Sequence, residues 1–323
     1  MRQYLLSRVL AIVPLLLGVM LVSFLIMTLA PGDPVAAYLT PETGINNPEV
    51  VAAIRKSLGL DQPLPIRFLL WLGNTLRGNL GYSFVSRRLV TVEIGSRIFN
   101  SLLLAIVSLI LSLILGVLVG IHSALNQYKW SDYLATVLAF IGISLPGFWF
   151  AMMLILLFTA RLQWLPSVGM TNPSATPGTL NYFVDVIKHM IMPVTVLSLS
   201  STGRWARYMR SSMLEVVRQD YMRTARSKGL LERVVIYRHG FRNALIPIVT
   251  LLGMSIPNLI SGSFVIESVF GWPGMGRLGV NAIFSRDYQV VMGVTLFSSI
   301  LVMIGNFLAD VTYAVVDPRI RYR

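Results

Sequence analysis

The sequence of 323 residues contains no cysteine, which excludes disulfide bonds, thiol catalysis and cysteine-ligated metal sites. Charged residues are also scarce. They make up 13% of the chain, where a typical soluble domain has about 25%. Hydrophobic residues, by contrast, make up 55% of the chain. This balance predicts an integral membrane protein.

Sequence motifs of nucleotide-binding and hydrolytic enzymes are missing too. The chain has no GxxxxGK[ST] phosphate loop, no HExxH and no GxSxG. Its three histidines, His122, His189 and His239, lie far apart in the sequence, each near the edge of an apolar stretch. That spacing indicates membrane interfaces rather than a metal site. We therefore expect no catalytic residue, no metal ligand, no cofactor held by this chain and no enzymatic activity of its own.

Charge is absent from six stretches, and these predict an all-α polytopic protein with six transmembrane helices. About 20 apolar residues in a helix cross a bilayer core of about 30 Å. The fourth stretch has only 14 residues, so its helix is expected to begin near Phe183 and to continue past Arg204. The third contains Pro146, which is expected to kink the helix. The uncharged stretches are 9–30, 98–121, 133–160, 190–203, 243–266 and 288–309.

These stretches divide the chain into four regions. Proline and glycine are frequent after the first helix, where short helices are expected over 47–58 and 68–76. The regions are an N-terminal transmembrane helix (1–30), an extracytoplasmic loop region (31–92), a core with the other five transmembrane helices (93–317) and a cytoplasmic tail (318–323).

The basic residues predict the orientation. The net charge of +13 could suggest nucleic acid, but the basic residues cluster beside apolar stretches, which favours membrane orientation instead. Ten of the 27 Lys and Arg residues lie between Arg204 and Arg242. With both termini in the cytoplasm, 16 basic residues fall inside and 11 outside. We therefore predict that the 204–242 stretch is cytoplasmic and that nucleic acid is not a partner.

The 204–242 stretch is predicted to form two helices joined at a glycine. Asp220 is expected to cap a short helix over 221–228 through its side-chain oxygen. Arg226 and Lys228 fall in the last turn, where cations suit the helix dipole. Gly229 stands where a left-handed closing residue is needed. A second helical segment is expected to start with Glu232 in its first turn.

DYMRTARSKGL at 220–230 and RHGFRNALIPIVT at 238–250 give this stretch a family resemblance. They resemble the coupling loop of permease subunits in ABC importers, most closely the peptide, nickel and opine class. PGDP at 31–34, FGWPG at 270–274 and DPRIRYR at the end resemble the same class. One departure is that the Glu-Ala-Ala of many ABC importers is replaced here by Arg223, Thr224 and Ala225.

The resemblance implies a type I permease fold with an extracytoplasmic insertion after the first helix. It implies a homologous second permease, two ATPase subunits that bind ATP and Mg, an extracytoplasmic solute-binding protein and a bacterial or archaeal cell membrane. Di- and oligopeptides are the expected solutes, with nickel, opines, glutathione and oligosaccharides as alternatives. The residues expected to couple to the ATPases are Asp220, Tyr221, Arg223, Thr224, Ala225, Arg226, Lys228 and Gly229.

Other functions and roles stay open at this level. A secondary carrier or channel is the main alternative, although carriers usually place ionisable groups within the membrane. An intramembrane enzyme would need a polar cluster that the uncharged stretches lack. Ser144, Pro146 and Asn258 are candidates for the translocation path, with a helix–helix hydrogen bond as an equal alternative for Asn258. The ESVFGWPGMGRLG segment (267–279) is either a gate or an aromatic belt with turns.

Overall fold

The structure is a computed structural model that describes residues 2–29, 48–57, 61–260 and 264–316. Its described part is helical, with one isolated β-bridge between Tyr82 and Leu89 and no strand. The helices in the first half of the chain are α1 (Arg2–Leu29), α2 (Pro48–Ser57), α3 (Leu64–Leu76), α4 (Val90–Leu125), α5 (Trp130–Ser144) and α6 (Gly147–Leu154), which runs into the π-helical η2 (Ile155–Arg161). Those that follow are α7 (Leu180–Val217), α8 (Asp220–Ser227), α9 (Glu232–Val234), the π-helical η3 (Val235–Phe241), α10 (Arg242–Ile260), α11 (Phe264–Val269), α12 (Met275–Phe284) and α13 (Tyr288–Val316).

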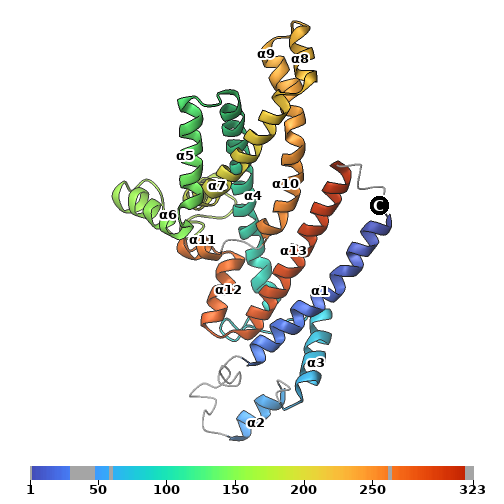
Figure 1. Cartoon of the computed structure of the whole chain (residues 1–323). Helices are drawn as coiled ribbons and strands as arrows, with labels where there is room; N and C mark the ends of the chain where they lie inside the picture. The colour runs from blue at the N-terminus through green and yellow to red at the C-terminus, as the bar shows by residue number, and fades with distance from the viewer. Residues whose placement is uncertain (1, 30–47, 58–60, 261–263, 317–323) are drawn as a thin grey trace.

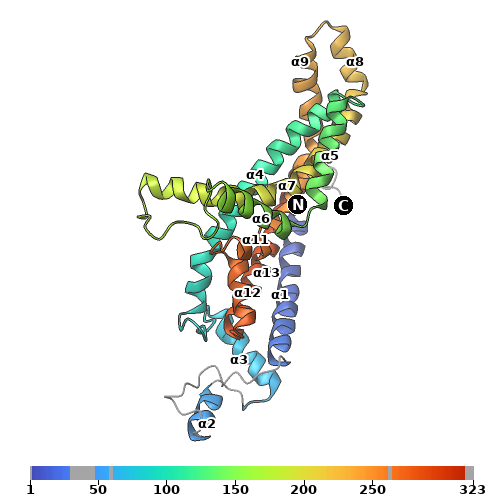
Figure 2. The same ribbon diagram turned by 90° about the vertical axis from the view of Figure 1, so that its left-hand side faces the viewer.

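The molecule is elongated, with different parts of the chain at its two ends. Helices α8 and α9 form one end, and α2 and α3 lie at the opposite end (Figure 1). Helices α1 and α13 pack along each other between these ends, as Figure 2 also shows. The expected short helices at 47–58 and 68–76 are confirmed as α2 and α3.

Four helices among the described residues are long and apolar enough to cross a membrane. They are Leu10–Leu29 within α1, α4, α7 and Tyr288–Ala309 within α13. They coincide with most of the first uncharged stretch and contain the second, fourth and sixth, and α7 runs from before Phe183 to well past Arg204, as predicted. The fifth stretch falls on α10, on residues 261–263, which lie outside the described residues, and on the start of α11.

The third uncharged stretch is not the single kinked helix that was predicted. Helix α5 ends at Ser144 and the next begins at Gly147, with a bend of 101° between them. Proline disfavours helical geometry in the residue before it, and Leu145 is accordingly extended, with φ −72° and ψ 128°. Because Pro146 is extended as well, the chain turns sharply, and α6 leaves the axis of α5 (Figure 1).

The tightest helix–helix contact joins α4 and α7 through glycines. Gly116 and Gly120 form a GxxxG pair on α4 and face Trp205 and Met209 of α7. A Cβ on Gly120 would lie 2.6 Å from Met209 Cβ and 2.7 Å from the Ala206 carbonyl oxygen. Small residues at such a contact allow two helix backbones to approach closely, which drives association where lipid removes the hydrophobic effect.

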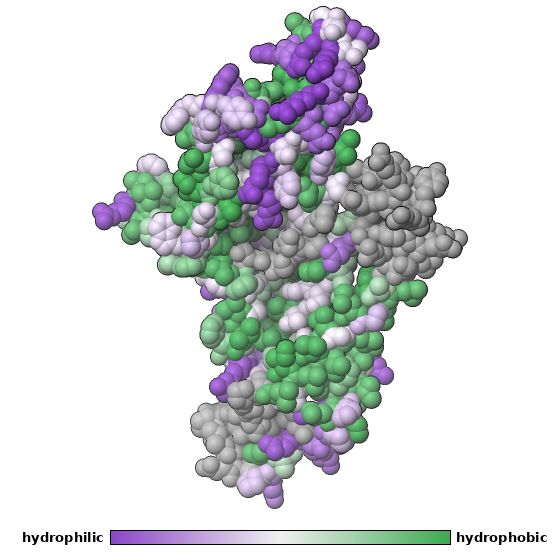
Figure 3. Space-filling model, viewed as in Figure 1, coloured by the Kyte–Doolittle hydropathy of each residue, from purple (hydrophilic) through white to green (hydrophobic). Residues whose placement is uncertain are grey.

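The surface has the polarity of a membrane protein. Figure 3 shows hydrophobic residues gathered over the middle of the molecule and hydrophilic ones at the end formed by α8 and α9. Large apolar side chains are exposed on the long apolar helices, among them Leu115 and Leu118 of α4, and Phe140 is exposed on α5. Monomeric proteins in water rarely expose so large an apolar surface, so lipid or partner subunits must cover it.

Gly120→Ala tests the glycine contact. The added methyl group would overpack the α4–α7 interface, a change that typically costs about 1–3 kcal/mol. We expect a lower yield of folded protein and a lower midpoint of thermal unfolding in detergent. Gly95→Ala is the matched control, because Gly95 lies on the same helix with no atom within 4 Å of an added Cβ. Equal stability of the two variants would contradict the role of the contact.

Candidate functional site

The candidate site is the hairpin at the end of the molecule, formed by the C-terminal end of α7, α8, α9 and η3. Helix α7 ends at Val217, and the chain becomes extended at Gln219, with φ −73° and ψ 151°. The Gln219 carbonyl oxygen then accepts hydrogen bonds from the backbone N–H groups of Met222 and Arg223, at 3.0 and 3.4 Å. Gln219 is therefore the N-cap residue of α8.

The predicted cap at Asp220 is wrong. Asp220 is the first residue of the helix, and the N-cap position carries no side-chain hydrogen bond. Its carboxylate instead lies 3.8 Å from the Arg223 guanidinium. The helix starts one residue earlier than expected because the extended residue that precedes it is Gln219. The negative charge of Asp220 still falls in the first turn, where it favours the helix dipole.

Helix α8 packs one face into the hairpin. Met222 and Val235 are fully buried and Ala225 is 6% exposed, and together they form a small apolar cluster with Val216 and Val217 at the end of α7. Ala225 therefore contributes to packing rather than to the outer surface. The other predicted coupling side chains are exposed on the hairpin, at Asp220, Tyr221, Arg223, Thr224, Arg226 and Lys228.

Gly229 closes α8 as predicted. Its φ is +71°, in the left-handed region that favours glycine, and no neighbour lies within 4 Å of an added Cβ. Just beyond the turn, Glu232 accepts hydrogen bonds from Arg226 Nη2 at 2.9 Å and from Arg226 Nε at 3.2 Å. The Arg226 guanidinium lowers the pKa of Glu232 through these bonds. The ion pair ties α8 to α9 across the glycine.

This ion pair was not predicted from the sequence, where Arg226 was expected to favour the helix dipole and Glu232 to start the next helix. The available signal was an arginine and a glutamate placed symmetrically three residues on either side of Gly229, because a tight turn brings such positions together.

A second ion pair joins the C-terminal part of α7 to α5. Arg210 donates from Nε and Nη2 to the two carboxylate oxygens of Asp132, at 3.0 and 2.8 Å. The Asp132 side chain is buried and also accepts from the Tyr128 N–H at 3.1 Å. The Ser212 hydroxyl donates to the Ala244 carbonyl oxygen of α10 at 2.9 Å. The helix that carries the hairpin is therefore bonded to both α5 and α10.

The ESVFGWPGMGRLG segment forms an anchor against α4. Glu267 is buried and accepts hydrogen bonds from the Ser101 hydroxyl at 2.7 Å and from the Arg277 N–H at 3.0 Å. Ser101 also accepts from the Met275 N–H at 2.8 Å. One carboxylate and one hydroxyl thus satisfy N–H groups in the first turn of α12, which would otherwise lack partners.

The aromatic-belt interpretation of this segment is wrong for Trp272. Its side chain is fully buried, and its Nε1 donates to the Asn100 carbonyl oxygen at 3.0 Å. Asn100 in turn donates from Nδ2 to the Pro273 carbonyl oxygen at 2.9 Å. An aromatic belt needs side chains that face the lipid interface, whereas this one is part of the core.

The structure separates Ser144 from Pro146, two of the residues that were predicted to line the translocation path. Pro146 lines a cavity of about 390 Å³ at the α5–α6 bend, where α7 and α11 contribute Val196 and Ile266. Ser144 is exposed at the end of α5 and is not among the residues that line this cavity. Asn258 lies in α10, and its side chain is outside the described residues.

Met222→Ala tests the packing of α8. Removing most of a fully buried methionine side chain leaves a cavity, which costs about 2–5 kcal/mol. We expect trypsin to cut the detergent-solubilised protein within α8 at least about ten-fold faster, because proteolysis follows local opening. The control is Tyr221→Ala, which changes the neighbouring, exposed side chain. Equal cleavage of Met222→Ala and the unmodified chain would show that α8 does not depend on this cluster.

Comparison with known proteins assigns the family. Residues 112–322 match the model of the binding-protein-dependent transport system inner membrane component, and residues 1–105 match the model of its N-terminal region. The oligopeptide transport system permease protein AppB of Bacillus subtilis (strain 168) is 42% identical over 323 residues, covering all of both chains. The glutathione transport system permease protein GsiC of Salmonella typhimurium (strain LT2) is 41% identical, again over all of both chains. The chain therefore belongs to the inner membrane components of binding-protein-dependent transport systems, as a permease subunit of the peptide-type ABC importers.

Proposed function

We propose that this permease subunit forms part of the translocation path for di- and oligopeptides. Two full-length relatives support this choice, since one is named for oligopeptide transport and the other for transport of glutathione, itself a small peptide. Nickel, opines and oligosaccharides are the weaker candidates. The path would include the α5–α6 bend with Ser144 and Pro146, together with Asn258 of α10.

The chain would work with four kinds of partner: a homologous second permease, two ATPase subunits, a solute-binding protein and the surrounding lipid. ATP and Mg would be bound by the ATPase subunits, since the sequence contains no phosphate loop. The hairpin of α8 and α9 would dock on an ATPase, with Tyr221, Arg223, Thr224 and Lys228 as the contacting side chains. Asp220 and Arg226 would complete that surface, while Ala225 and Gly229 would shape it.

The observation that supports this coupling role is the set of contacts that hold the hairpin together. Its outer face is polar and exposed, its inner face is an apolar cluster, and an ion pair closes its turn. A displacement of α8 would also displace α7 and α10, because packed and hydrogen-bonded elements move together. Tilting of these helices would then open the path on the far side of the membrane.

Gly229→Val tests the coupling role. A β-branched residue in the left-handed conformation costs about 1–2 kcal/mol locally, which would redirect α8. We expect normal membrane insertion but loss of solute-stimulated ATP hydrolysis by the assembled importer. Gly178→Val is the matched control, because Gly178 also has positive φ and open space but lies in the link before α7. Normal stimulation in Gly229→Val would refute the coupling assignment.

The proposed orientation has both termini and the α8 hairpin in the cytoplasm. Because the chain has no cysteine, single cysteines can report sidedness. Gln62→Cys, near the start of α3, should react with a membrane-impermeant maleimide in intact cells. Ser227→Cys should react only after the cells are opened. Labelling of both positions from outside would overturn this orientation.

A further inference from the structure

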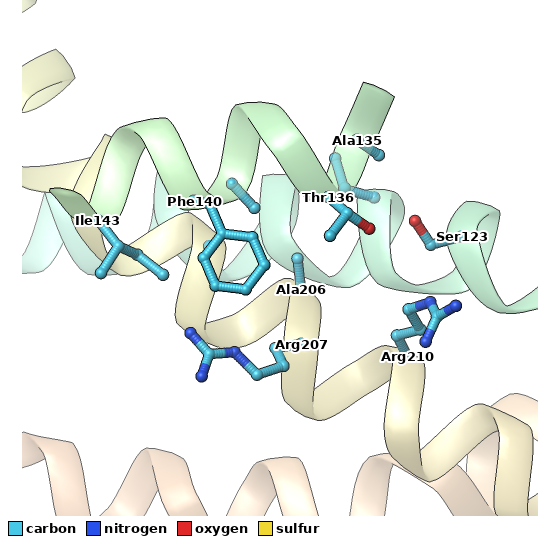
Figure 4. A pocket seen from close by; sticks show the side chains of 11 residues that line it. Ser123, Ala135, Thr136, Phe140, Ile143, Ala206, Arg207 and Arg210 are labelled. Carbon is cyan, nitrogen blue, oxygen red and sulfur yellow. The ribbon is translucent and has the colours of Figure 1, made fainter. Parts of the chain in front are cut away.

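A cavity of about 240 Å³ lies between α4, α5 and α7, beside the ion pair that joins α5 to α7 (Figure 4). Its wall is mostly apolar, with Val119 from α4 and with Ala139, Phe140 and Ile143 from α5. Its polar side chains are Ser123 of α4, Thr136 of α5 and two arginines of α7. The cavity therefore combines an apolar wall with cationic side chains.

Within the described part of the chain, only one of the two arginines has its charge balanced by a carboxylate. Arg210 is paired with Asp132 through two hydrogen bonds. Arg207 instead lies over the Phe140 ring, with its guanidinium carbon 5.5 Å from the ring centre. Among the described residues no acidic side chain forms an ion pair with Arg207. Figure 4 shows its guanidinium beside Phe140, well apart from Arg210.

The sequence around the cavity indicates its depth in the membrane. Arg207 comes four residues after the uncharged stretch of α7 ends at Gly203. Across the cavity, α5 begins beside Tyr128, Trp130 and Tyr133, all of which are exposed. Exposed Tyr and Trp side chains mark the level of lipid headgroups. The cavity thus opens at the headgroup level on the side of the α8 hairpin.

We infer that this cavity binds an anionic phospholipid with a glycerol headgroup, such as phosphatidylglycerol. The phosphodiester would pair with the Arg207 guanidinium, whose planar fork suits phosphate oxygens. The Thr136 hydroxyl lines the same cavity and would face the headgroup glycerol, whereas the Ser123 hydroxyl is engaged by Asp132. An acyl chain would follow the apolar wall formed by Ala139, Phe140 and Ile143. A basic pocket between membrane helices is a known setting for anionic headgroups.

A bound lipid would have a mechanical consequence. It would fill the space between α5 and α7 next to the Asp132–Arg210 pair and so brace the helix that carries the hairpin. The inference is independent of which solute the importer carries.

The test uses the full-length chain purified in detergent and titrated with phosphatidylglycerol or phosphatidylcholine, with bound lipid counted by native mass spectrometry. We expect preferential retention of phosphatidylglycerol. Arg207→Gln should lower its retention about five-fold, the size expected for one basic residue at an anionic surface. Arg204→Gln is the matched control, because Arg204 is exposed on the same helix but does not line the cavity. Ala139→Phe, which fills the cavity and leaves Arg207 in place, should lower retention as well.

Four results would overturn the inference. Equal retention of the two lipids would mean that the headgroup is not selected. Equal loss in Arg204→Gln and Arg207→Gln would reduce the effect to general surface charge. Displacement of the lipid by soluble glycerol phosphate at similar concentration would show a site for a free phosphate compound instead. Retention by the chain alone but not in the assembled importer would assign the surface to the second permease.

Discussion

The close approach of α4 and α7 at Gly116 and Gly120 is the contact on which the rest of the structure depends. In a membrane, apolar side chains gain little by leaving lipid for protein, so helices associate through close packing and hydrogen bonds. The glycines bring the two longest helices together where a larger residue would clash with Met209 and the α7 backbone. Helix α7 then extends past its uncharged stretch and carries the α8 hairpin.

Polar contacts then hold the helices together near both ends of the α4–α7 pair. On the hairpin side, Arg210 is bonded to Asp132, and the Ser212 hydroxyl is bonded to α10. On the other side, Glu267 and Ser101 hold α12 against α4. Except for the partly exposed Arg210, these side chains are buried, and a buried polar group without a partner is costly. They therefore specify one arrangement of the helices rather than merely adding to stability.

The hairpin itself combines two features that a docking element needs. Its inner face is held by Met222, Ala225 and Val235, and its turn is closed by Arg226 and Glu232 across a left-handed glycine. Its outer face remains polar and exposed. The exposed ion pair adds little stability by itself, so its main effect is to define the angle between α8 and α9.

The sequence by itself determined the membrane character, the positions of most helices, the left-handed Gly229 and the family. Each depends on local information: uncharged length, a glycine after a helix, or short phrases of residues. Tertiary structure alone decided the 101° bend between α5 and α6, the burial of Trp272 and the partners of Asp132 and Glu267. Arg210 lies 78 residues from Asp132, and Ser101 lies 166 residues from Glu267. Residue patterns show where a charge or a hydroxyl stands along a helix, but its partner is chosen by how the helices pack.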